Sequence, residues 1–334
     1  MSGLEVGAVG LGRESAAQLE AYRSELIGYC YRMLGSVFDA EDAVQETMVR
    51  AWRGLDRFEE RSSLRSWIYR IATNVCLDAL AAGKRRARPM DLSAPTSGAT
   101  SPGPALDVSL WIEPCPAAVA HTPANPAEAA EAGESVRLAF IAALQHLPSK
   151  QRATLLLREV LGFTAREVAD LHGCTVASVN SALQRARATL AARREATGDT
   201  ALPSPDAVQR ALAKRYAAAF SRFDMEELTM LLHVDATMSL PPYALWMRGV
   251  TTIQAWLTGP AIGCRGSRLL PTLANGSPAF GQYRPSATGT GFEPWALQVR
   301  DISGDRITDI HVFRDTERLF PLFHLPPHLD EHEA

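Results

Sequence analysis

The chain has few cysteines and no long apolar run. Its 334 residues include five cysteines, none of them in a C-x-x-C pair. This sparse, odd-numbered set excludes a disulfide scaffold and indicates reduced thiols. No hydrophobic stretch approaches the thickness of a bilayer, and the first residues lack the basic and apolar regions of a secretory signal. We therefore expect a protein of the cytoplasm.

Signatures of catalysis are also missing. The sequence contains no glycine loop of the kind that cradles phosphate and no nucleophile elbow. The pattern His328-Leu-Asp-Glu-His332 resembles a zinc-protease motif, but no residues follow that could complete a metal site. We expect no metal, no cofactor and no enzymatic activity.

Charge is nearly balanced overall but is distributed unevenly. The 34 Lys and Arg against 37 Asp and Glu give a formal net charge of −3, which excludes a uniformly basic surface. Residues 135–195 contain nine Lys and Arg against four Asp and Glu. Such a local excess is typical of a DNA-contacting module, although a solvated helical face would have the same composition.

The composition changes along the chain and divides it into segments. With 46% hydrophobic residues, the chain can bury more than one core. A helical segment (14–88) is followed by a Pro/Ala-rich linker (89–127) and a second helical segment (128–196). A last segment of mixed character covers 206–325. Within the linker, Trp111 and Ile112 are apolar. Such residues often dock on a surface, but chance explains them equally well.

Residues 164–187 are typical of a helix-turn-helix. Thr164 and Glu167 form a capping box for a first helix. Gly173 supplies the turn, and Thr175 can cap a second helix. Apolar residues recur at helical spacing in the second helix and predict a buried stripe: Val176, Val179, Leu183 and Leu190. Polar side chains that can bond bases or phosphates lie on the opposite face: Ser178, Ser181, Gln184 and Arg185. An ordinary helical hairpin is the alternative.

The last segment has a different pattern. Residues 207–232 predict an amphipathic helix, and 251–257 a shorter one. Short runs of strand-forming residues follow the long helix: 236–240, 279–283, 295–301 and 307–313. The last two flank Ser303-Gly-Asp305, which is a hairpin signal. Helices that precede a run of antiparallel strands indicate an α+β domain.

Residues 39–52 resemble the region with which bacterial sigma-70 family factors clamp the β′ subunit of RNA polymerase. Val44, Met48 and Ala51 form an apolar stripe along this helix. Its polar stripe suits a protein partner. The resemblance implies that core polymerase is bound by the polar residues Asp42, Gln45, Glu46 and Arg50. Taken alone, a helix of this pattern is more often an ordinary surface helix.

Residues 58–78 resemble the promoter-melting and minus-ten-reading region of extracytoplasmic-function sigma factors. Arginines that can hold an opened strand alternate there with aromatic residues. By helical spacing, Trp67 and Ile71 fit a core better than a stacking platform. A run of basic residues, 84–88, follows at the end of this helix, and its positive charges can contact DNA phosphates. The residues expected to contact DNA here are Arg61, Arg65, Arg70, Asn74, Lys84 and Arg85.

The helix-turn-helix resembles the sigma region that reads the minus-thirty-five element. Arg187 lies toward the flank of the second helix, where we expect a phosphate contact. Both sigma-like regions occur in the family's order, with a linker between them. Asn180 and Ala182 stand where many relatives carry Lys and Arg. The promoter sequence that those relatives read therefore cannot be assigned to this protein.

The last segment resembles the SnoaL-like domains of NTF2 fold that are fused to some of these sigma factors. The turn at 246–250 and the strand 309–313 carry this resemblance. It implies a cone with an apolar pocket that can hold a small molecule, lined by Met238, Trp246, Trp256, Trp295, His311 and Phe313. His311 and Asp235 could form an acid/base pair, but structural roles are favoured.

The sequence thus predicts a multi-domain protein, with two all-α sigma domains followed by an α+β, NTF2-like cone. We expect an alternative sigma factor that binds the β′ and β subunits of core RNA polymerase and promoter DNA. Its C-terminal domain would pack against the DNA-binding domains and tune activity in cis, without a separate anti-sigma factor. The alternative is a helix-turn-helix regulator fused to a catalytically active NTF2-fold enzyme. A ligand-sensing repressor is disfavoured, because the clamp-like and melting-like regions would then have no role.

Overall fold

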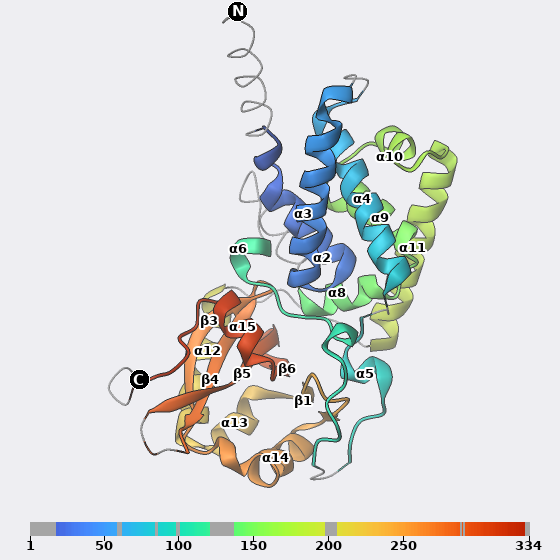
Figure 1. Ribbon diagram of the computed structural model, residues 1–334. Coiled ribbons are helices and arrows are strands. Elements are labelled where there is room, and N and C mark those ends of the chain that lie inside the picture. The colour runs from blue at the N-terminus through green and yellow to red at the C-terminus, as the bar shows by residue number, and fades with distance from the viewer. Residues whose placement is uncertain are drawn as a thin grey trace, which may run out of the picture. The chain divides into compact units, whose positions relative to one another are not determined.

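The computed structural model describes residues 18–58, 62–83, 86–97, 101–120, 137–197, 206–287, 289 and 291–330. The chain forms two compact units, and each combines segments that are far apart in sequence (Figure 1). The first unit comprises Met1–Arg86 and Ala118–Gly198, and the second comprises Ala87–Ala117 and Asp199–Ala334. None of the described helices is both long enough and apolar enough to span a bilayer.

The N-terminal segment of the first unit is built from the helices α2 (Arg23–Leu34), α3 (Val37–Gly54) and α4 (Leu64–Ala82), with a 3-10 turn, η1 (Leu55–Arg57), after α3. Gly35 ends α2 with a φ of 77°, a left-handed conformation that favours glycine. The Ser36 side chain then caps α3 by accepting a hydrogen bond from the Asp39 amide (3.2 Å). Between α2 and α4, the rings of Tyr29 and Tyr69 meet edge to face at 5.3 Å in the buried core.

The second segment of this unit contains α8 (Leu138–Gln145), α9 (Ser149–Leu155), α10 (Ala165–His172) and α11 (Val176–Thr197). The helix α9 continues as a π-helical turn, η3 (Leu156–Val160). Gly162 then reverses the chain with a φ of 70°. The helix-turn-helix of α10 and α11 follows directly.

Arg152 of α9 joins the two segments of the first unit. Its side chain is buried, and its guanidinium donates hydrogen bonds to Oε1 of Gln145 (2.6 Å) and to the main-chain oxygen of Met33. It also donates to the carbonyl oxygens of Gln145 and Leu147. Carbonyl groups in the last turn of a helix lack partners within the helix. One arginine therefore caps the C-terminal ends of both α2 and α8.

The second unit contains a six-stranded sheet in the order β2-β1-β6-β5-β4-β3. The strands β1 and β6 pair in parallel, and all other neighbours pair antiparallel. The strands are β1 (Leu232–Ser239), β2 (Trp246–Arg248), β3 (Arg268–Ala274), β4 (Ser277–Pro285), β5 (Phe292–Ser303) and β6 (Arg306–Phe313).

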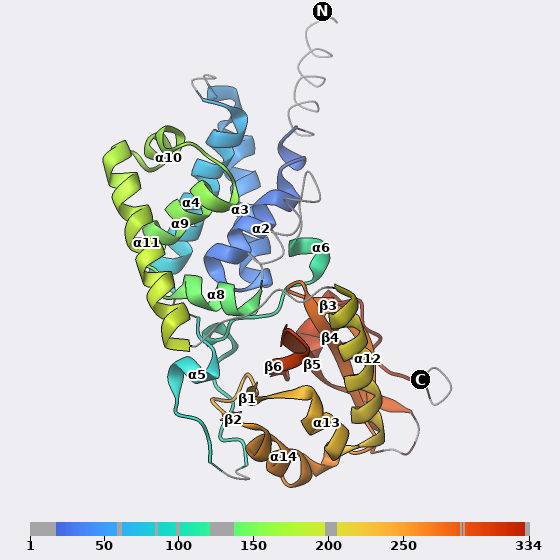
Figure 2. The ribbon, with the colours of Figure 1, turned by 180° about the vertical axis from the view of Figure 1, so that it is seen from behind.

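Helices accompany this sheet: α12 (Asp206–Arg222), α13 (Met225–Leu231), α14 (Val250–Thr258), η4 (Ile262–Cys264) and α15 (Thr316–Leu322). Both ribbon views show α12 lying across the sheet (Figures 1 and 2). The core between them contains the rings of Tyr216 and Phe220 of α12, whose centroids are 5.7 Å apart, and Phe280 of β4. The expected α+β domain is confirmed.

Some elements of this domain differ from the sequence prediction, among them β2 (Trp246–Arg248), which lies where a turn was expected. The helix expected over 207–232 is interrupted by Phe223, which has a φ of 56°, and Asp224 caps a separate α13. The strand β3 was not expected, because Pro271 in its centre cannot donate to a ladder. This strand lies at the edge of the sheet, where a proline is tolerated.

Residues 87–117, expected as part of a linker, pack with the second unit. Within this segment are α5 (Pro89–Leu92) and η2 (Val108–Leu110), and α6 (Ala117–Ala120) starts at its end. Near its start, the indole Nε1 of Trp246 donates to the carbonyl oxygen of Ser93 (2.9 Å), and Ser93 Oγ donates to that of Ala244 (2.8 Å). This segment, residues 87–117, is called the docked linker below.

The far end of the docked linker is also fixed. The Cys115 amide donates to Oδ1 of Asn275 (2.8 Å), and the Asn275 amide donates back to the Cys115 carbonyl (2.8 Å). Glu113 pairs with Arg318 of α15 (2.8 Å). The two apolar residues noted in this segment, Trp111 and Ile112, are both 3% exposed. The docked linker is therefore a folded part of the second unit.

Candidate polymerase and promoter interfaces

The helix α3 presents the polar stripe proposed to bind polymerase. Its apolar side is buried through Val44 and Ala51, while Met48 is half-buried. The proposed polymerase contacts are all exposed: Asp42, Gln45, Glu46 and Arg50. Arg50 forms an ion pair with Glu46 (2.6 Å), and its guanidinium also lies 3.6 Å from Asp78 of α4. Hydrogen bonding to Glu46 raises the pKa of Arg50. The face is charged and exposed, and Arg50 is paired with carboxylates within the protein.

Sequence reasoning missed an apolar patch on the same helix. Trp52 is 67% exposed and Val49 is 37% exposed. The signal was available, because Trp52 follows Ala51 directly and so falls outside the buried stripe of α3. Exposed aromatic residues are enriched at protein interfaces, and these two residues therefore extend the candidate partner surface.

The helix α4 exposes only some of the residues expected to contact DNA. Arg70 and Asn74 are exposed on it. Trp67 is half-buried, with its ring centroid 5.1 Å from that of Phe58, in agreement with a packing role. Three expected contacts lie outside the described residues: Arg61, Lys84 and Arg85.

Arg65 is engaged by other parts of the protein. Its guanidinium donates to Glu25 (2.5 Å) and to the carbonyl oxygen of Leu161 (3.2 Å). It also lies over the ring of Phe163, 4.4 Å from the centroid, and Tyr69 meets Phe163 edge to face at 5.2 Å. Burial by itself would lower the pKa of Arg65, but the hydrogen bond and charge of Glu25 raise it. In this conformation, Arg65 links α4 to the loop before α10.

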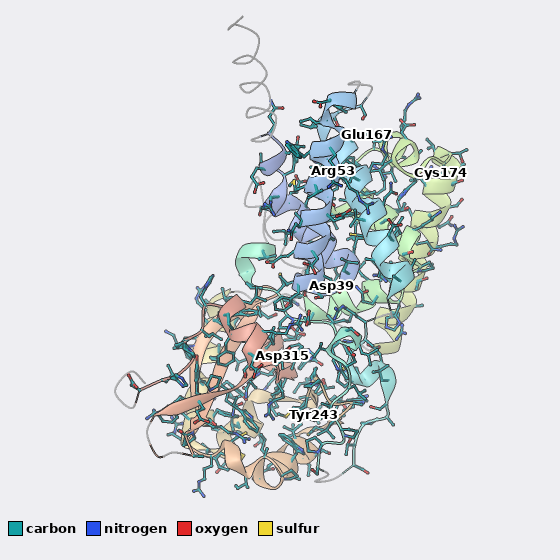
Figure 3. The ribbon with its side chains drawn as sticks, viewed as in Figure 1. Asp39, Arg53, Glu167, Cys174, Tyr243 and Asp315 are labelled. Atoms are coloured by element: carbon teal, nitrogen blue, oxygen red, sulfur yellow. The ribbon has the colours of Figure 1, made fainter. Side chains whose placement is uncertain are left out.

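The helix-turn-helix has the caps that the sequence predicts. The amide of Thr164 donates to Glu167 (2.7 Å), and the Glu167 amide donates to Thr164 Oγ1 (3.2 Å). The hydrogen bond from the Thr164 amide lowers the pKa of Glu167. Gly173 ends α10 with a φ of 63°, and Thr175 Oγ1 accepts from the Ser178 amide (3.2 Å). Figure 3 shows Glu167 at the start of α10 and Cys174 in the turn.

The second helix of this motif, α11, buries a stripe and exposes the opposite face. Val179, Leu183 and Ala186 are buried, and Leu190 is half-buried. Val176 was wrongly expected in the stripe. It is 42% exposed, because it begins the helix and packing starts one turn later. The expected DNA contacts are all exposed: Ser178, Ser181, Gln184, Arg185 and Arg187.

Two of these five side chains interact within the protein. The guanidinium of Arg187 pairs with Glu159 (2.7 Å from Nε), and Ser178 Oγ bonds Thr175 (2.9 Å). The ion pair is exposed, and exposed pairs contribute little to stability. Arg187 can therefore exchange Glu159 for a phosphate at small cost. The side chains of Gln184 and Arg185 project into solvent on the same face.

The six residues expected to line a pocket in the C-terminal domain lie on two faces of the sheet. Met238 and Trp256 belong to the core that α12 covers, and Trp295 packs against it. Successive side chains of a strand point to opposite faces. His311 and Phe313 alternate with the core residues of β6, and Trp246 is paired with Ser239 on β1. These six residues therefore do not surround one cavity.

The acid/base pair considered for His311 and Asp235, against which structural roles were favoured, is not formed. His311 is buried, with Nε2 3.4 Å from Asp301 and Nδ1 3.0 Å from Ser239 Oγ. Asp235 instead pairs with Arg248 (3.4 Å), and both side chains are exposed. The correction follows from the strand register, which places His311 opposite Ser239 and Val299. Among the described residues, no cluster of three or more His, Cys, Asp or Glu could hold a metal.

Comparison with known proteins assigns the two helical segments. A family model described as Sigma-70 region 2 matches residues 19–86, and one described as Sigma-70, region 4 matches residues 137–190. The ECF RNA polymerase sigma factor SigG of Mycobacterium tuberculosis is 43% identical over 317 residues, covering 94% of this chain and 84% of the relative. The chain belongs to the extracytoplasmic-function (ECF) sigma factors.

Other relatives agree with this assignment. A probable ECF sigma factor of the same organism, SigI, is 26% identical over 308 residues, covering 92% of this chain and 95% of the relative. The crystal structure of M. tuberculosis SigJ matches with a TM-score of 0.60 and 21% identity, over 93% of this chain and 99% of that chain. The latter likeness shows that the fold is shared.

As a sigma factor, this protein functions in transcription initiation by binding core RNA polymerase and promoter DNA. In the rest of the article, region 2 denotes residues 19–86 and region 4 denotes residues 137–190. Sigma factors act by binding and not by catalysis. Family membership therefore disfavours the alternative of a regulator fused to a working enzyme.

Proposed function

We propose that this ECF sigma factor selects promoters through region 2 and region 4, and that its C-terminal domain controls this activity in cis through the docked linker. In the proposal, α3 binds the β′ subunit and region 4 approaches the β subunit. The exposed residues of α4 read the minus-ten element, and α11 reads the minus-thirty-five element.

The docked linker is the observation that carries the cis proposal. A segment between two DNA-reading regions ordinarily behaves as a flexible tether, whose composition sets its reach. Here the segment that leaves region 2 after Arg86 is bonded at both ends to the C-terminal domain, through Trp246 and Asn275. Any change in this docking alters the path available between the two regions. The domain can thereby favour or disfavour promoters according to the spacing between their two elements, without contacting DNA itself.

The polymerase part of the proposal can be tested on α3. Replacing Asp42, Gln45 and Glu46 together by Ala should weaken binding to core polymerase at least tenfold in a fluorescence-anisotropy titration. The free energy of unfolding should change by only a few tenths of a kcal/mol, because all three side chains are exposed. Glu226→Gln, an exposed change on α13, is the control. Unchanged affinity of a folded triple variant would remove α3 from the interface.

The cis part is tested by loosening the docked linker with single substitutions. Trp246→Phe keeps an aromatic ring but removes the N–H that holds Ser93, and Asn275→Ala removes the side chain that holds Cys115. Each should change the yield of single-round transcription with core polymerase at least twofold, while binding of core polymerase stays the same. Glu226→Gln again serves as the control. If both variants transcribe like the parent although hydrogen exchange shows a loosened linker, cis control is refuted.

A further inference from the structure

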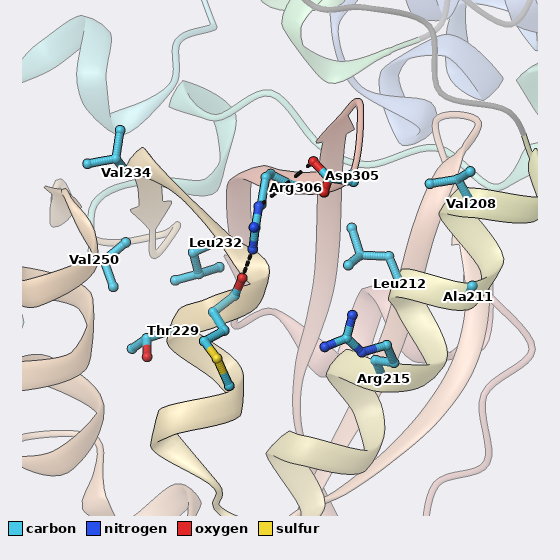
Figure 4. A pocket seen from close by; sticks show the side chains of 11 residues that line it. Val208, Ala211, Leu212, Arg215, Thr229, Leu232, Val234, Val250, Asp305 and Arg306 are labelled. Carbon is cyan, nitrogen blue, oxygen red and sulfur yellow. Dashed lines mark hydrogen bonds and ion pairs between the residues drawn. The ribbon is translucent and has the colours of Figure 1, made fainter.

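The C-terminal domain contains a hollow of about 630 Å³ that none of the functions above uses. It lies beside α12 and α13 and reaches the hairpin that joins β5 to β6 (Figure 4). Its walls are mainly apolar, with Val208 and Leu212 on α12, Val234 on β1 and Val250 on α14. Small-molecule sites in proteins typically have volumes of about 300–1,000 Å³ and apolar walls. The hollow has the size and the lining of such a site.

Apolar side chains around this hollow are strongly exposed. Val234 is 73% exposed, Met230 is 54% exposed and Val208 is 37% exposed. All three line the hollow. Large apolar side chains that gather at one exposed place mark a ligand or partner site. Covering them would remove apolar area from water, which is the main source of binding free energy for an apolar ligand.

Two arginines supply positive charge at the same place. Figure 4 shows Arg215 extending from α12 toward α13, and Arg306 of β6 reaching the end of α13; both line the hollow. Arg215 lies 3.5 Å from Glu227, which is held more closely by Arg222 (2.9 Å). Arg306 lies 3.8 Å from Asp305 and donates to the Met230 carbonyl.

Among the residues that the structure describes, neither arginine has a carboxylate partner closer than these. Both distances exceed the roughly 2.7–2.9 Å of a charge-assisted hydrogen bond. The side chains of Arg215 and Arg306 are 58% and 46% exposed, so these ion pairs contribute little and can be exchanged. A guanidinium group matches a planar carboxylate through two parallel hydrogen bonds. A ligand carboxylate could therefore replace both weak pairs.

We propose that this hollow binds an amphipathic carboxylate of the fatty-acid class. The alkyl chain lies along Val208 and Leu212, and the carboxylate is held between Arg215 and Arg306. The proposal deepens the cis-control hypothesis by giving the C-terminal domain a chemical signal, and in that respect it rests on the proposed function. Binding itself is independent of polymerase and of the docked linker, so the two ideas fail separately.

Calorimetric titration of the full-length protein with decanoate tests the site. We expect saturable binding of one ligand per chain at concentrations where decanoate is monomeric. Octanoate should bind up to about fifteenfold more weakly, because each buried methylene contributes about fourfold in affinity. Decanol, which has the chain without the charge, should bind at least about tenfold more weakly than decanoate, because it cannot form the charge-assisted bonds.

Substitutions of the two arginines separate this site from general adsorption. Arg215→Gln and Arg306→Gln should each weaken decanoate binding about five- to tenfold and leave decanol binding unchanged. Arg210→Gln, on the same helix but outside the hollow, is the matched control. The proposal is overturned if decanoate shows no saturable binding or binds no better than decanol. It also fails if the Arg210 variant loses as much affinity as the other two.

Discussion

Two arginines that are proposed to contact DNA, Arg65 and Arg187, have partners within the protein. Arg65 is bound by Glu25, Leu161 and the ring of Phe163, whereas Arg187 has only an exposed ion pair. The first set combines partial burial, hydrogen bonds and stacking, and the second is open to solvent. We therefore expect Arg187 to exchange its present partner for a DNA phosphate more readily than Arg65 does.

The recognition helix gives a prediction about promoter choice. Arg185→Ala should change the order of preference among promoters, because a bidentate contact to a base contributes about 1–3 kcal/mol of discrimination. Arg187→Ala should weaken binding to all promoters about equally. It should also reduce the slope of log K against log salt concentration by about one. Electrophoretic shifts over a promoter panel at several salt concentrations measure both effects. Unaltered preferences in the Arg185 variant would exclude that residue from base reading.

The cap of α10 gives a prediction about stability and pH. Thr164→Ala should lower the free energy of unfolding by about 1 kcal/mol in urea denaturation, whereas Thr164→Ser should retain most of the cap. The folded state lowers the pKa of Glu167 below its ordinary value of 4.5. Stability from this carboxylate is therefore present above about pH 4.5 and is lost as the pH falls through the lowered pKa.

Glu167→Gln provides the complementary measurement. This variant should be less stable than the parent at neutral pH, and the difference should shrink in acid as the parent carboxyl group is protonated. A difference that stays constant with pH would show that the charge of Glu167 has no part in the cap.

Local signals were enough to predict some residues, and long-range geometry was needed for others. The capping box and the αL glycine of the helix-turn-helix depend on residues a few positions apart, and the sequence shows them directly. The partner of His311 depends on how β1, β5 and β6 align, so the alternative with Asp235 is not formed and Asp301 could not be foreseen. The hollow of the C-terminal domain was unpredictable for the same reason.

At the level of elements, α4 and the loop before α10 form a contact that the proposed promoter binding has to break. The two promoter elements lie about 25 base pairs apart, or roughly 85 Å at 3.4 Å per base pair. Arg65 holds the Leu161 carbonyl at 3.2 Å. If region 2 and region 4 occupy the two elements at once, as proposed, we expect this contact to open.

This contact gives a prediction about α4. Arg65→Ala should lower the free energy of unfolding by about 1–3 kcal/mol, because charged hydrogen bonds and a carbonyl partner are lost. Arg70→Ala, on the same helix but exposed, should change it by less than about 0.5 kcal/mol. Urea denaturation of both variants measures the difference. Equal stabilities would show that the Arg65 contact contributes nothing in solution.

Helices were easier to predict than strands and the linker. The buried faces of α3 and α11 follow from spacing within each helix, although Val176 and Trp52 show that helix ends and stripe borders escape such reasoning. The strand β3 was missed because Pro271 obscures an edge strand. The docked linker has no periodicity of its own, and its fixed path depends on hydrogen bonds to residues more than a hundred positions away.

At the scale of the whole molecule, we predict that removal of the C-terminal domain changes transcription. A chain that ends at Thr197 should differ from the full-length protein in single-round transcription with core polymerase. Truncation also removes the partners of Ser93 and Cys115. The shortened chain must therefore be checked for aggregation by light scattering. Equal transcription by a monomeric truncated chain would contradict cis control.

The docked linker also decides which part of this protein can be exchanged with a relative. Sequence order suggests that the C-terminal domain could be transplanted as one continuous piece after Thr197. The compact unit, however, includes Ala87–Ala117 together with Asp199–Ala334. A chimera that takes only the second stretch would separate Asn275 and Arg318 from Cys115 and Glu113. The unit that can be exchanged therefore consists of two separate stretches of sequence, and we expect the docked linker and the C-terminal domain to evolve together.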